Sequence, residues 1–168
     1  MEKLIREVHI QDAQQLVDIY NYYVLNSVVT FDDTPFDSSL FEEKIKKVTS
    51  LFPFYVYEEN DEILGYAYAN KWRLKPAYKH TVESTVYLKH TAVGKQIGTK
   101  LYSHLLKELK KQNYHVIIGG VSLPNDVSIK LHENLGFKKV AHYNEVGLKF
   151  NKWVDVAFWQ LNFQTTNN

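Results

Sequence analysis

The chain has 168 residues, no cysteine, and 20 lysines and arginines against 19 aspartates and glutamates, which gives a formal net charge of +1. The interspersed charges exclude a basic stripe for nucleic acid, and the lack of cysteine excludes disulfides and cysteine-ligated metals. The sequence contains neither a run of membrane-spanning length nor an apolar signal-peptide core. We therefore expect a cytoplasmic protein without a membrane or nucleic-acid partner.

Hydrophobic periodicity predicts mixed helices and strands. The expected elements are a strand at 5–10, a helix capped by Asp12 and running through Tyr23, a helix at 38–48, strands at 54–58 and 63–70 joined by the turn 59–62, a loop at 71–79, a strand at 81–88, a helix at 96–112, a strand at 115–121, a helix at 125–135 and two C-terminal strands. The order βααβββαβαββ predicts an α/β or α+β sheet domain over residues 1–163, with a polar tail at 164–168.

The segment from Leu123 to Phe137 predicts a ligand seat. Asn125 follows a proline and is suited to cap a helix, and Gly136 is suited to end it. At the start of such a helix the backbone N–H groups are free, and Ser128 and His132 lie one and two turns further on. A lone histidine on a helix is more often structural, so the residues alone leave its role open.

A second candidate ligand site precedes the helix at 96–112. Its residues are Val93, Gly94, Lys95, Gln96, Ile97 and Gly98. Glycine lets a backbone approach phosphate oxygens, and free N–H groups at a helix start attract them, so a pyrophosphate could bind here. An ordinary turn is the alternative, because glycines before a helix are common.

Two features of the strands also allow more than one interpretation. Glu83 stands in the middle of a β-rich segment, where an unpaired carboxylate is costly to bury, so it is either a functional group or a surface ion-pair partner. Gly119 and Gly120 lie together in a strand, which indicates either a bulge or the close approach of a ligand.

Taken together, these residues resemble the GNAT N-acetyltransferases. Within that superfamily the chain closely resembles the phosphinothricin N-acetyltransferases, and the segments that carry the resemblance are Thr81–Tyr87, Leu101–Lys107, Leu123–Asp126, Leu131–Gly136 and Asp155–Leu161. The resemblance extends from Ile5 to Phe163. It implies a central mixed, mostly antiparallel sheet flanked by helices, and transfer of an acetyl group from acetyl-CoA to the amine of a small amino acid such as phosphinothricin or methionine sulfoximine. It also implies a homodimer and no metal.

The resemblance further implies roles for individual residues. Glu83 would be the general base, and His132 takes a place that many GNAT enzymes give to a tyrosine, as an acid or a base relay. The remaining expectations are main-chain pairing of Thr85, Val86 and Tyr87 with pantetheine, contacts of Asn125 and Ser128 with its amides, pyrophosphate at 93–98, an anionic acceptor held by Arg73, Lys75 and Tyr78, and pocket walls from Phe31 and Tyr102. Core packing is an equal alternative for Phe31.

The turn at 93–98 departs from the superfamily pattern, which has glutamine or arginine, two residues, glycine, one residue, and glycine or alanine. Here Val93 and Gln96 stand at the first two of these places, and only Gly98 is kept. An acetyl-CoA-binding relative without turnover is therefore one alternative. A transferase for peptide N-termini or other amines is another, although the cationic loop argues against polyamines.

Overall fold

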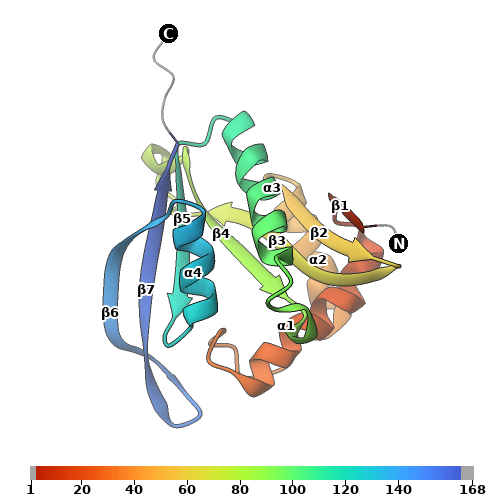
Figure 1. The fold of residues 1–168 in the computed structure, drawn as a ribbon, viewed down its shortest axis with the longest axis horizontal. Helices are drawn as coiled ribbons and strands as arrows, with labels where there is room; N and C mark the ends of the chain where they lie inside the picture. The colour runs from red at the N-terminus through yellow and green to blue at the C-terminus, as the bar shows by residue number, and fades with distance from the viewer. Residues whose placement is uncertain (1–2, 164–168) are drawn as a thin grey trace.

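The computed structural model describes residues 3–163, and the expected class and element order are confirmed (Figure 1). The strands are β1 (Lys3–Glu7), β2 (Phe54–Glu59), β3 (Glu62–Lys71), β4 (Thr81–Leu88), β5 (Val116–Ser122), β6 (Lys138–Lys149) and β7 (Lys152–Asn162). The helices are α1 (Ala13–Asn26), α2 (Ser38–Thr49), α3 (Ile97–Lys111) and α4 (Asp126–Asn134), with short 3-10 turns at Ile10–Asp12, Pro76–Tyr78 and His90–Ala92. The tail expected at 164–168 lies outside the described residues.

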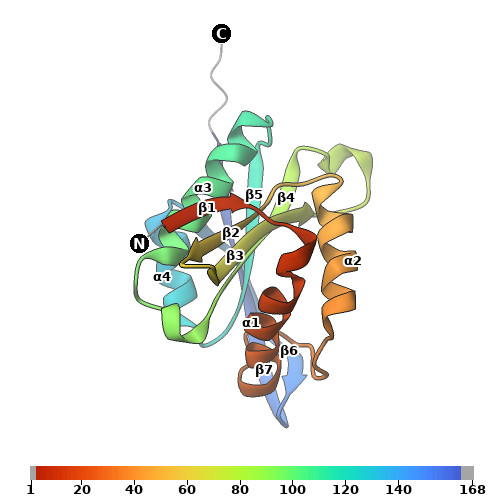
Figure 2. The same ribbon diagram turned by 90° about the vertical axis from the view of Figure 1, so that its right-hand side faces the viewer.

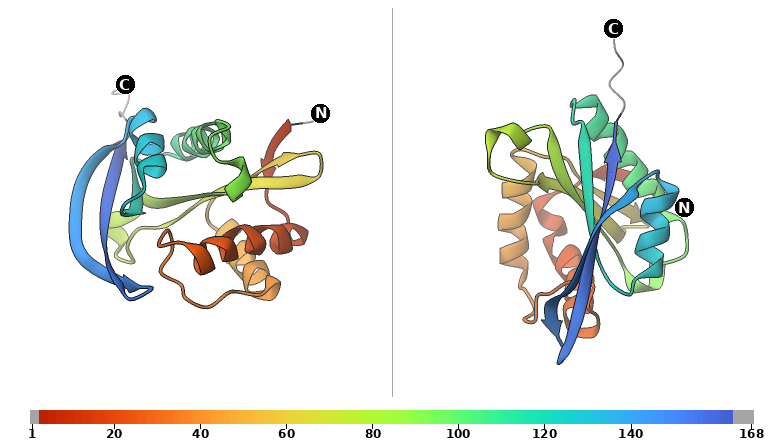
Figure 3. Two further views of the ribbon diagram at one scale, coloured as in Figure 1. Left: turned by 60° about the horizontal axis from the view of Figure 1, so that its bottom comes forward. Right: turned by 90° about the vertical axis from the view of Figure 1, so that its left-hand side faces the viewer.

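All seven strands form one sheet in the order β1-β2-β3-β4-β5-β7-β6. Only β4 and β5 pair in parallel, so the expected mixed, mostly antiparallel sheet is confirmed. Helices α1 and α2 cover one face, and α3 and α4 lie on the other (Figure 3). Each face therefore has its own hydrophobic core. No helix within residues 3–163 is long and apolar enough to cross a membrane.

The turn between β2 and β3 has the backbone that the sequence predicts. Asn60 and Asp61 have φ angles of 54° and 63°, as a two-residue hairpin turn with a left-handed backbone requires. Asparagine and aspartate tolerate this region better than most residues, so the local sequence fixes the hairpin.

The start of α1 differs from the expected arrangement. Asp12 does not cap α1 with its side chain; its carboxylate accepts the His9 backbone N–H at 2.7 Å and two Arg6 guanidinium bonds at 2.8 and 2.9 Å. The 3-10 turn at Ile10–Asp12 therefore replaces the end of the strand expected at 5–10. Asp12 ties this turn to β1.

The parallel pair β4 and β5 separates after a short contact. Its register covers only Thr81 with Val116, Val82 with Ile117 and Glu83 with Ile118. Immediately beyond it, Ser84 Oγ donates a hydrogen bond to the Ile118 carbonyl at 3.2 Å. From this point the strands diverge towards the N-terminal end of α4 (Figure 1). The divergence opens the middle of the sheet.

Candidate active site

A cleft of about 220 Å³ lies where β4 and β5 separate. It is lined by Val29, by Glu83 to Tyr87 of β4, by Gly120 to Ser122 of β5, and by Asn125, Ser128, Leu131 and His132 around α4. A second, more apolar hollow of about 240 Å³ continues from it to Val93. The two share six lining residues, so one groove runs from Glu83 to the turn before α3.

One edge of β4 is free along this groove. The opposite edge of β4 pairs with β3 as far as Leu88, whereas within residues 3–163 the edge facing β5 has no strand partner beyond Glu83. Thr85, Val86 and Tyr87 line the groove along this edge. An extended ligand could pair with such an edge as an added strand does.

Glu83 lies at the inner end of the groove, with its side chain partly buried. Burial raises the pKa of its carboxyl above the ordinary value, and the positive charge of Arg73 offsets part of that rise. Gly120 lies alongside, since a Cβ there would come within 3.6 Å of Glu83 Oε1. A carboxylate with a raised pKa in a cleft is suited to accept a proton near neutral pH.

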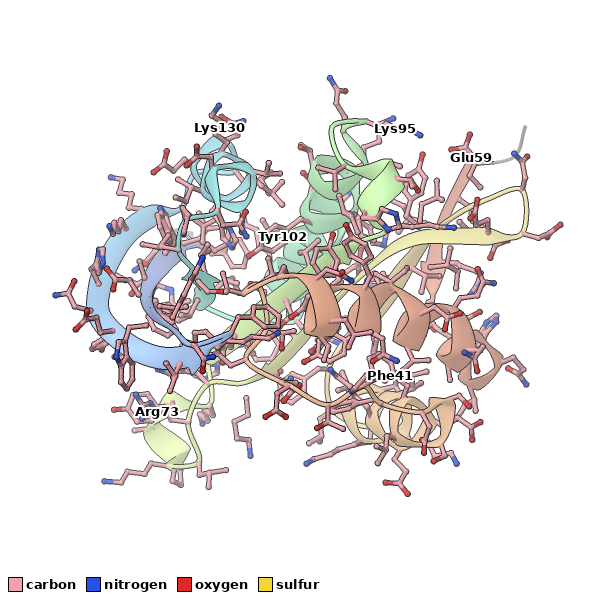
Figure 4. The ribbon with its side chains drawn as sticks, turned by 90° about the horizontal axis from the view of Figure 1, so that it is seen from below. Phe41, Glu59, Arg73, Lys95, Tyr102 and Lys130 are labelled. Carbon is pink, nitrogen blue, oxygen red and sulfur yellow. The ribbon has the colours of Figure 1, made fainter. Side chains whose placement is uncertain are left out.

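The loop between β3 and β4 brings one of its three expected residues towards Glu83. Arg73 stacks on the Trp72 ring at 5.0 Å, and the Trp72 ring packs edge-on against Phe158 at 5.8 Å. Arg73, Lys75 and Tyr78 are all exposed and lie outside the cleft lining, and Arg73 acts on Glu83 through its charge. Arg73 lies on the opposite side of the molecule from Lys95 and Lys130 (Figure 4). None of these three charged residues is among those that line the groove.

His132 is 6% exposed and surrounded by aromatic rings, those of Tyr102, Phe137 and Trp159. Its Nδ1 lies 2.7 Å from the Ser128 carbonyl oxygen, and because a carbonyl only accepts, Nδ1 carries a proton. Burial lowers the pKa of the imidazole. The neutral ring then carries its proton on Nδ1 and keeps the Nε2 lone pair as an acceptor, and His132 lines the cleft.

Gly119 and Gly120 of β5 leave room for the side chains of neighbouring residues. The register of β5 with β7 is unbroken from Val116 to Ser122, so the bulge considered from the sequence is absent there. A Cβ at Gly119 would lie 2.3 Å from His132 Nε2, and one at Gly120 would lie 3.0 Å from the Phe158 ring. The strand must lack a side chain at Gly119, whereas at Gly120 a small shift of the Phe158 ring would make room for one.

The turn before α3 has a partly left-handed backbone. Gly94 and Gln96 have φ angles of 85° and 61°, so Gln96 adopts the conformation that favours the glycine of the superfamily pattern. The Ile97 side chain is buried in the core, so only its main chain can meet a ligand. Gly98 is buried. A Cβ at this position would press on the Leu88 side chain at 3.2 Å and on the Leu131 side chain at 3.5 Å. Val93 and Lys95 are exposed.

At the start of α4, Asn125 is the expected cap. Its Oδ1 accepts the Ser128 backbone N–H at 3.1 Å, and both residues line the groove.

Tyr102 corrects a prediction: it is fully buried, and its hydroxyl lies 2.6 Å from Ser84 Oγ, so it supports the strand fork and does not wall the pocket. Phe31 is 42% exposed but outside the cleft lining, and its ring lies against Gly147 of β6.

Three contributors were not identified from the sequence. Val29 lines both parts of the groove from the loop between α1 and α2, where no periodicity marks it. Ser84 bridges the strands where they separate, and Lys149 reaches that same loop from β6. A polar residue inside an alternating strand was the only available signal. Among residues 3–163, no three histidine, aspartate or glutamate side chains gather as metal ligands would.

Comparison with known proteins identifies the family. The model of the acetyltransferase (GNAT) domain matches residues 5–158, so the chain belongs to the GNAT acetyltransferases. The phosphinothricin N-acetyltransferase of Streptomyces viridochromogenes is 35% identical, with 95% of this chain and 87% of the relative covered. The L-methionine sulfoximine/L-methionine sulfone acetyltransferase of Salmonella typhimurium is 35% identical over 89% of this chain and 88% of its own. A Salmonella typhimurium acetyltransferase solved with its cofactor acetyl-CoA superposes with a TM-score of 0.94 at 33% identity, covering 99% of this chain and 96% of the other.

Proposed function

We propose that this protein transfers the acetyl group of acetyl-CoA to the α-amino group of a small amino acid or analogue, in the cytoplasm, with Glu83 as general base. The observation that carries the proposal is the partly buried Glu83 carboxyl at the fork of β4 and β5, with its raised pKa and Arg73 nearby. The names of the relatives supply the acceptor class, phosphinothricin and methionine sulfoximine.

The residues of the groove suit acetyl-CoA in two respects. The unpaired edge of β4 offers main-chain donors and acceptors to the amides of pantetheine, beside Asn125 and Ser128. The first N–H groups of α3 are free, and the left-handed residues Gly94 and Gln96 shape the turn before them, which suits a pyrophosphate. Acetyl-CoA would supply an acyl group activated as a thioester.

The chemistry required of the protein is proton removal and charge stabilisation. The acceptor amine must lose its ammonium proton before its nitrogen can attack, and Glu83 takes that proton directly or through water. The new C–N bond forms as the C–S bond breaks. The acylated nitrogen then loses its remaining excess proton to solvent, and the sulfur leaves as a thiolate that takes a proton from solvent. A main-chain N–H on the free edge of β4 would stabilise the carbonyl oxygen while charge develops on it.

Arg73 would bind the acidic group of the acceptor, because a guanidinium can hold a carboxylate or phosphinate through two hydrogen bonds. Lys75 and Tyr78 lie on the same exposed loop and would contribute only if the loop closes over the acceptor. Loops of this kind move readily on binding.

We expect Arg73→Met to raise the acceptor KM about tenfold, since hydrogen bonds to charged groups are worth roughly that much. It should also move the acidic limb of kcat/KM to higher pH, because the charge that lowers the pKa of Glu83 is removed. The check is a pH–rate profile. Lys79→Met, on the same exposed loop, is the control and should leave the limb in place.

The β6–β7 hairpin supports a homodimer. It extends beyond the rest of the sheet and carries six large apolar side chains, each more than half exposed, namely Val140, Tyr143, Val146, Leu148, Phe150 and Trp153 (Figure 2). Apolar surface gathered on an edge strand is typical of an interface. Sedimentation velocity should give a dimer for the wild type and a monomer for Trp153→Lys; a wild-type monomer at micromolar concentration contradicts this.

The activity is tested by following thiol release from acetyl-CoA with a panel of amines. We expect release with phosphinothricin, methionine sulfoximine or methionine sulfone, and little with spermidine or a peptide N-terminus. No release with any of the three would refute the acceptor class. Binding of acetyl-CoA without transfer to any amine would indicate a non-catalytic relative.

A further inference from the structure

Lys149 is a buried lysine that the proposed chemistry does not use. It lies in β6 and is 4% exposed. Its Nζ donates a hydrogen bond to the Thr30 carbonyl at 2.8 Å and approaches the Tyr23 carbonyl at 3.5 Å. Tyr23 belongs to the last turn of α1, whose carbonyl end attracts a cation, and its oxygen also accepts the Ser27 backbone N–H at 3.1 Å and the Ser27 hydroxyl at 3.0 Å. One ammonium thus joins the outermost strand to the end of α1 and the loop that follows it.

A second contact joins the same two segments. The Phe31 ring lies so close to Gly147 that a Cβ at position 147 would come within 2.3, 2.6 and 2.7 Å of three ring atoms. Gly147 is two residues before Lys149, so both contacts come from the same short stretch of β6. The loop from 27 to 37 is held at Thr30 by the hydrogen bond from the Lys149 ammonium, and at Phe31 by the packing of its ring against Gly147.

The clamped loop reaches the groove and has its own internal bonds. Val29, one residue before Thr30, lines both the cleft beside Glu83 and the hollow beside Val93. Thr30 Oγ1 lies 2.7 Å from Tyr20 Oη, and Tyr20 also donates to the Asp32 carboxylate. A displacement at Thr30 would therefore move the wall formed by Val29.

We infer that Lys149 is a positioning residue for the acceptor site, and that with Gly147 it clamps the loop 27–37 so that Val29 forms the wall of the cleft facing the acceptor. This inference rests on the proposed function for its kinetic consequence, whereas the clamp itself is a property of the fold. Lys149 acts through Thr30 and does not contact the reacting atoms. The groups facing its ammonium are the two carbonyls, Asp32 and Asp33 from the loop, and the Phe150 ring at 5.0 Å.

The clamp is tested with Lys149→Met, which keeps the length of the side chain and removes the charge. We expect the acceptor KM to rise about tenfold and the KM for acetyl-CoA to rise by less, because Val29 also lines the hollow beside Val93, where the free edge of β4 would still pair with acetyl-CoA. Gly147→Ala disturbs the same loop from its second contact and should give the same split. Lys152→Met, an exposed lysine of the same hairpin, is the control and should match the wild type.

Amide hydrogen exchange distinguishes this inference from the proposed function. In Lys149→Met the amides of 27–37 should exchange at least about tenfold faster than in the wild type, with those of β4 unchanged. Equal exchange in the two proteins would overturn the clamp, whatever the activity. Faster exchange with both KM values raised equally would make Lys149 a general stabilising residue. If the wild type transfers no acetyl group, the proposed function fails while exchange still decides the clamp.

Discussion

Replacing Glu83 with glutamine is expected to lower kcat by about 100- to 10,000-fold, the usual contribution of a positioned general base. Glutamine keeps the shape of the side chain beside Gly120 but cannot take the ammonium proton. The affinity for acetyl-CoA, measured by calorimetry, should stay within about twofold, because its expected contacts lie further along β4. Glu43→Gln on the exposed face of α2 is the control. Wild-type kcat in Glu83→Gln would remove this residue from the mechanism.

The same substitution should stabilise the fold. Burial raises the pKa of Glu83, so the folded state disfavours the ionised carboxylate. The resulting cost is fully present above the folded pKa and disappears below the unfolded value of about 4.3. Glu83→Gln should therefore raise Tm at pH 7 and lose that advantage in acid. An unchanged Tm at pH 7 would mean that Glu83 is well solvated and poorly suited to be a base.

Gly119→Ala is expected to cause the largest loss of stability, about 3 kcal/mol in the free energy of unfolding, because it overpacks a closed site. The new methyl group would lie 2.3 Å from His132 Nε2, and His132 is confined by three aromatic rings. Urea unfolding measures the change. Gly120→Ala is the matched control: its methyl group meets the Phe158 ring at 3.0 Å, so a small shift suffices and the loss should be below about 1 kcal/mol.

A second substitution tests whether His132 is the cause. In the Gly119→Ala background, His132→Ala should restore part of the lost stability, although the same change in the wild type destabilises the protein by opening a cavity. Equal losses for the two alanine variants, or no restoration by His132→Ala, would mean that the space beside Gly119 does not depend on the histidine.

Local signals account for most of what the sequence predicts correctly. The helices and strands follow from periodicity, the β2–β3 turn from Asn60 and Asp61, and the start of α4 from Asn125. The groove does not follow in this way, because it depends on where the pairing of β4 with β5 stops. That point is set by contacts between residues far apart in the chain, at Glu83 and Ile118. Periodicity cannot locate it.

The incorrect or missed assignments have a common physical reason. Tyr102 recurs at helical spacing with core residues, and its hydroxyl is hydrogen-bonded to Ser84 inside the core. A tyrosine is a residue type suited to a pocket, but the residue type alone predicted its place wrongly. Asp12 bonds Arg6 and His9 instead of capping α1. Lys149 finds its partners in carbonyls that no sequence pattern marks. Each case depends on a partner supplied by tertiary packing.

The most direct test is to mix the protein with acetyl-CoA in stoichiometric amounts, first alone and then with L-methionine sulfoximine, while measuring free CoA and the intact mass of the protein. Direct transfer in the groove predicts no release of CoA and no acetylated protein before the acceptor is added. It then predicts one N-acetyl product for each CoA released. A burst of CoA with an acetylated protein in the absence of acceptor would contradict direct transfer. Release of CoA without N-acetylated product would contradict amine acetylation.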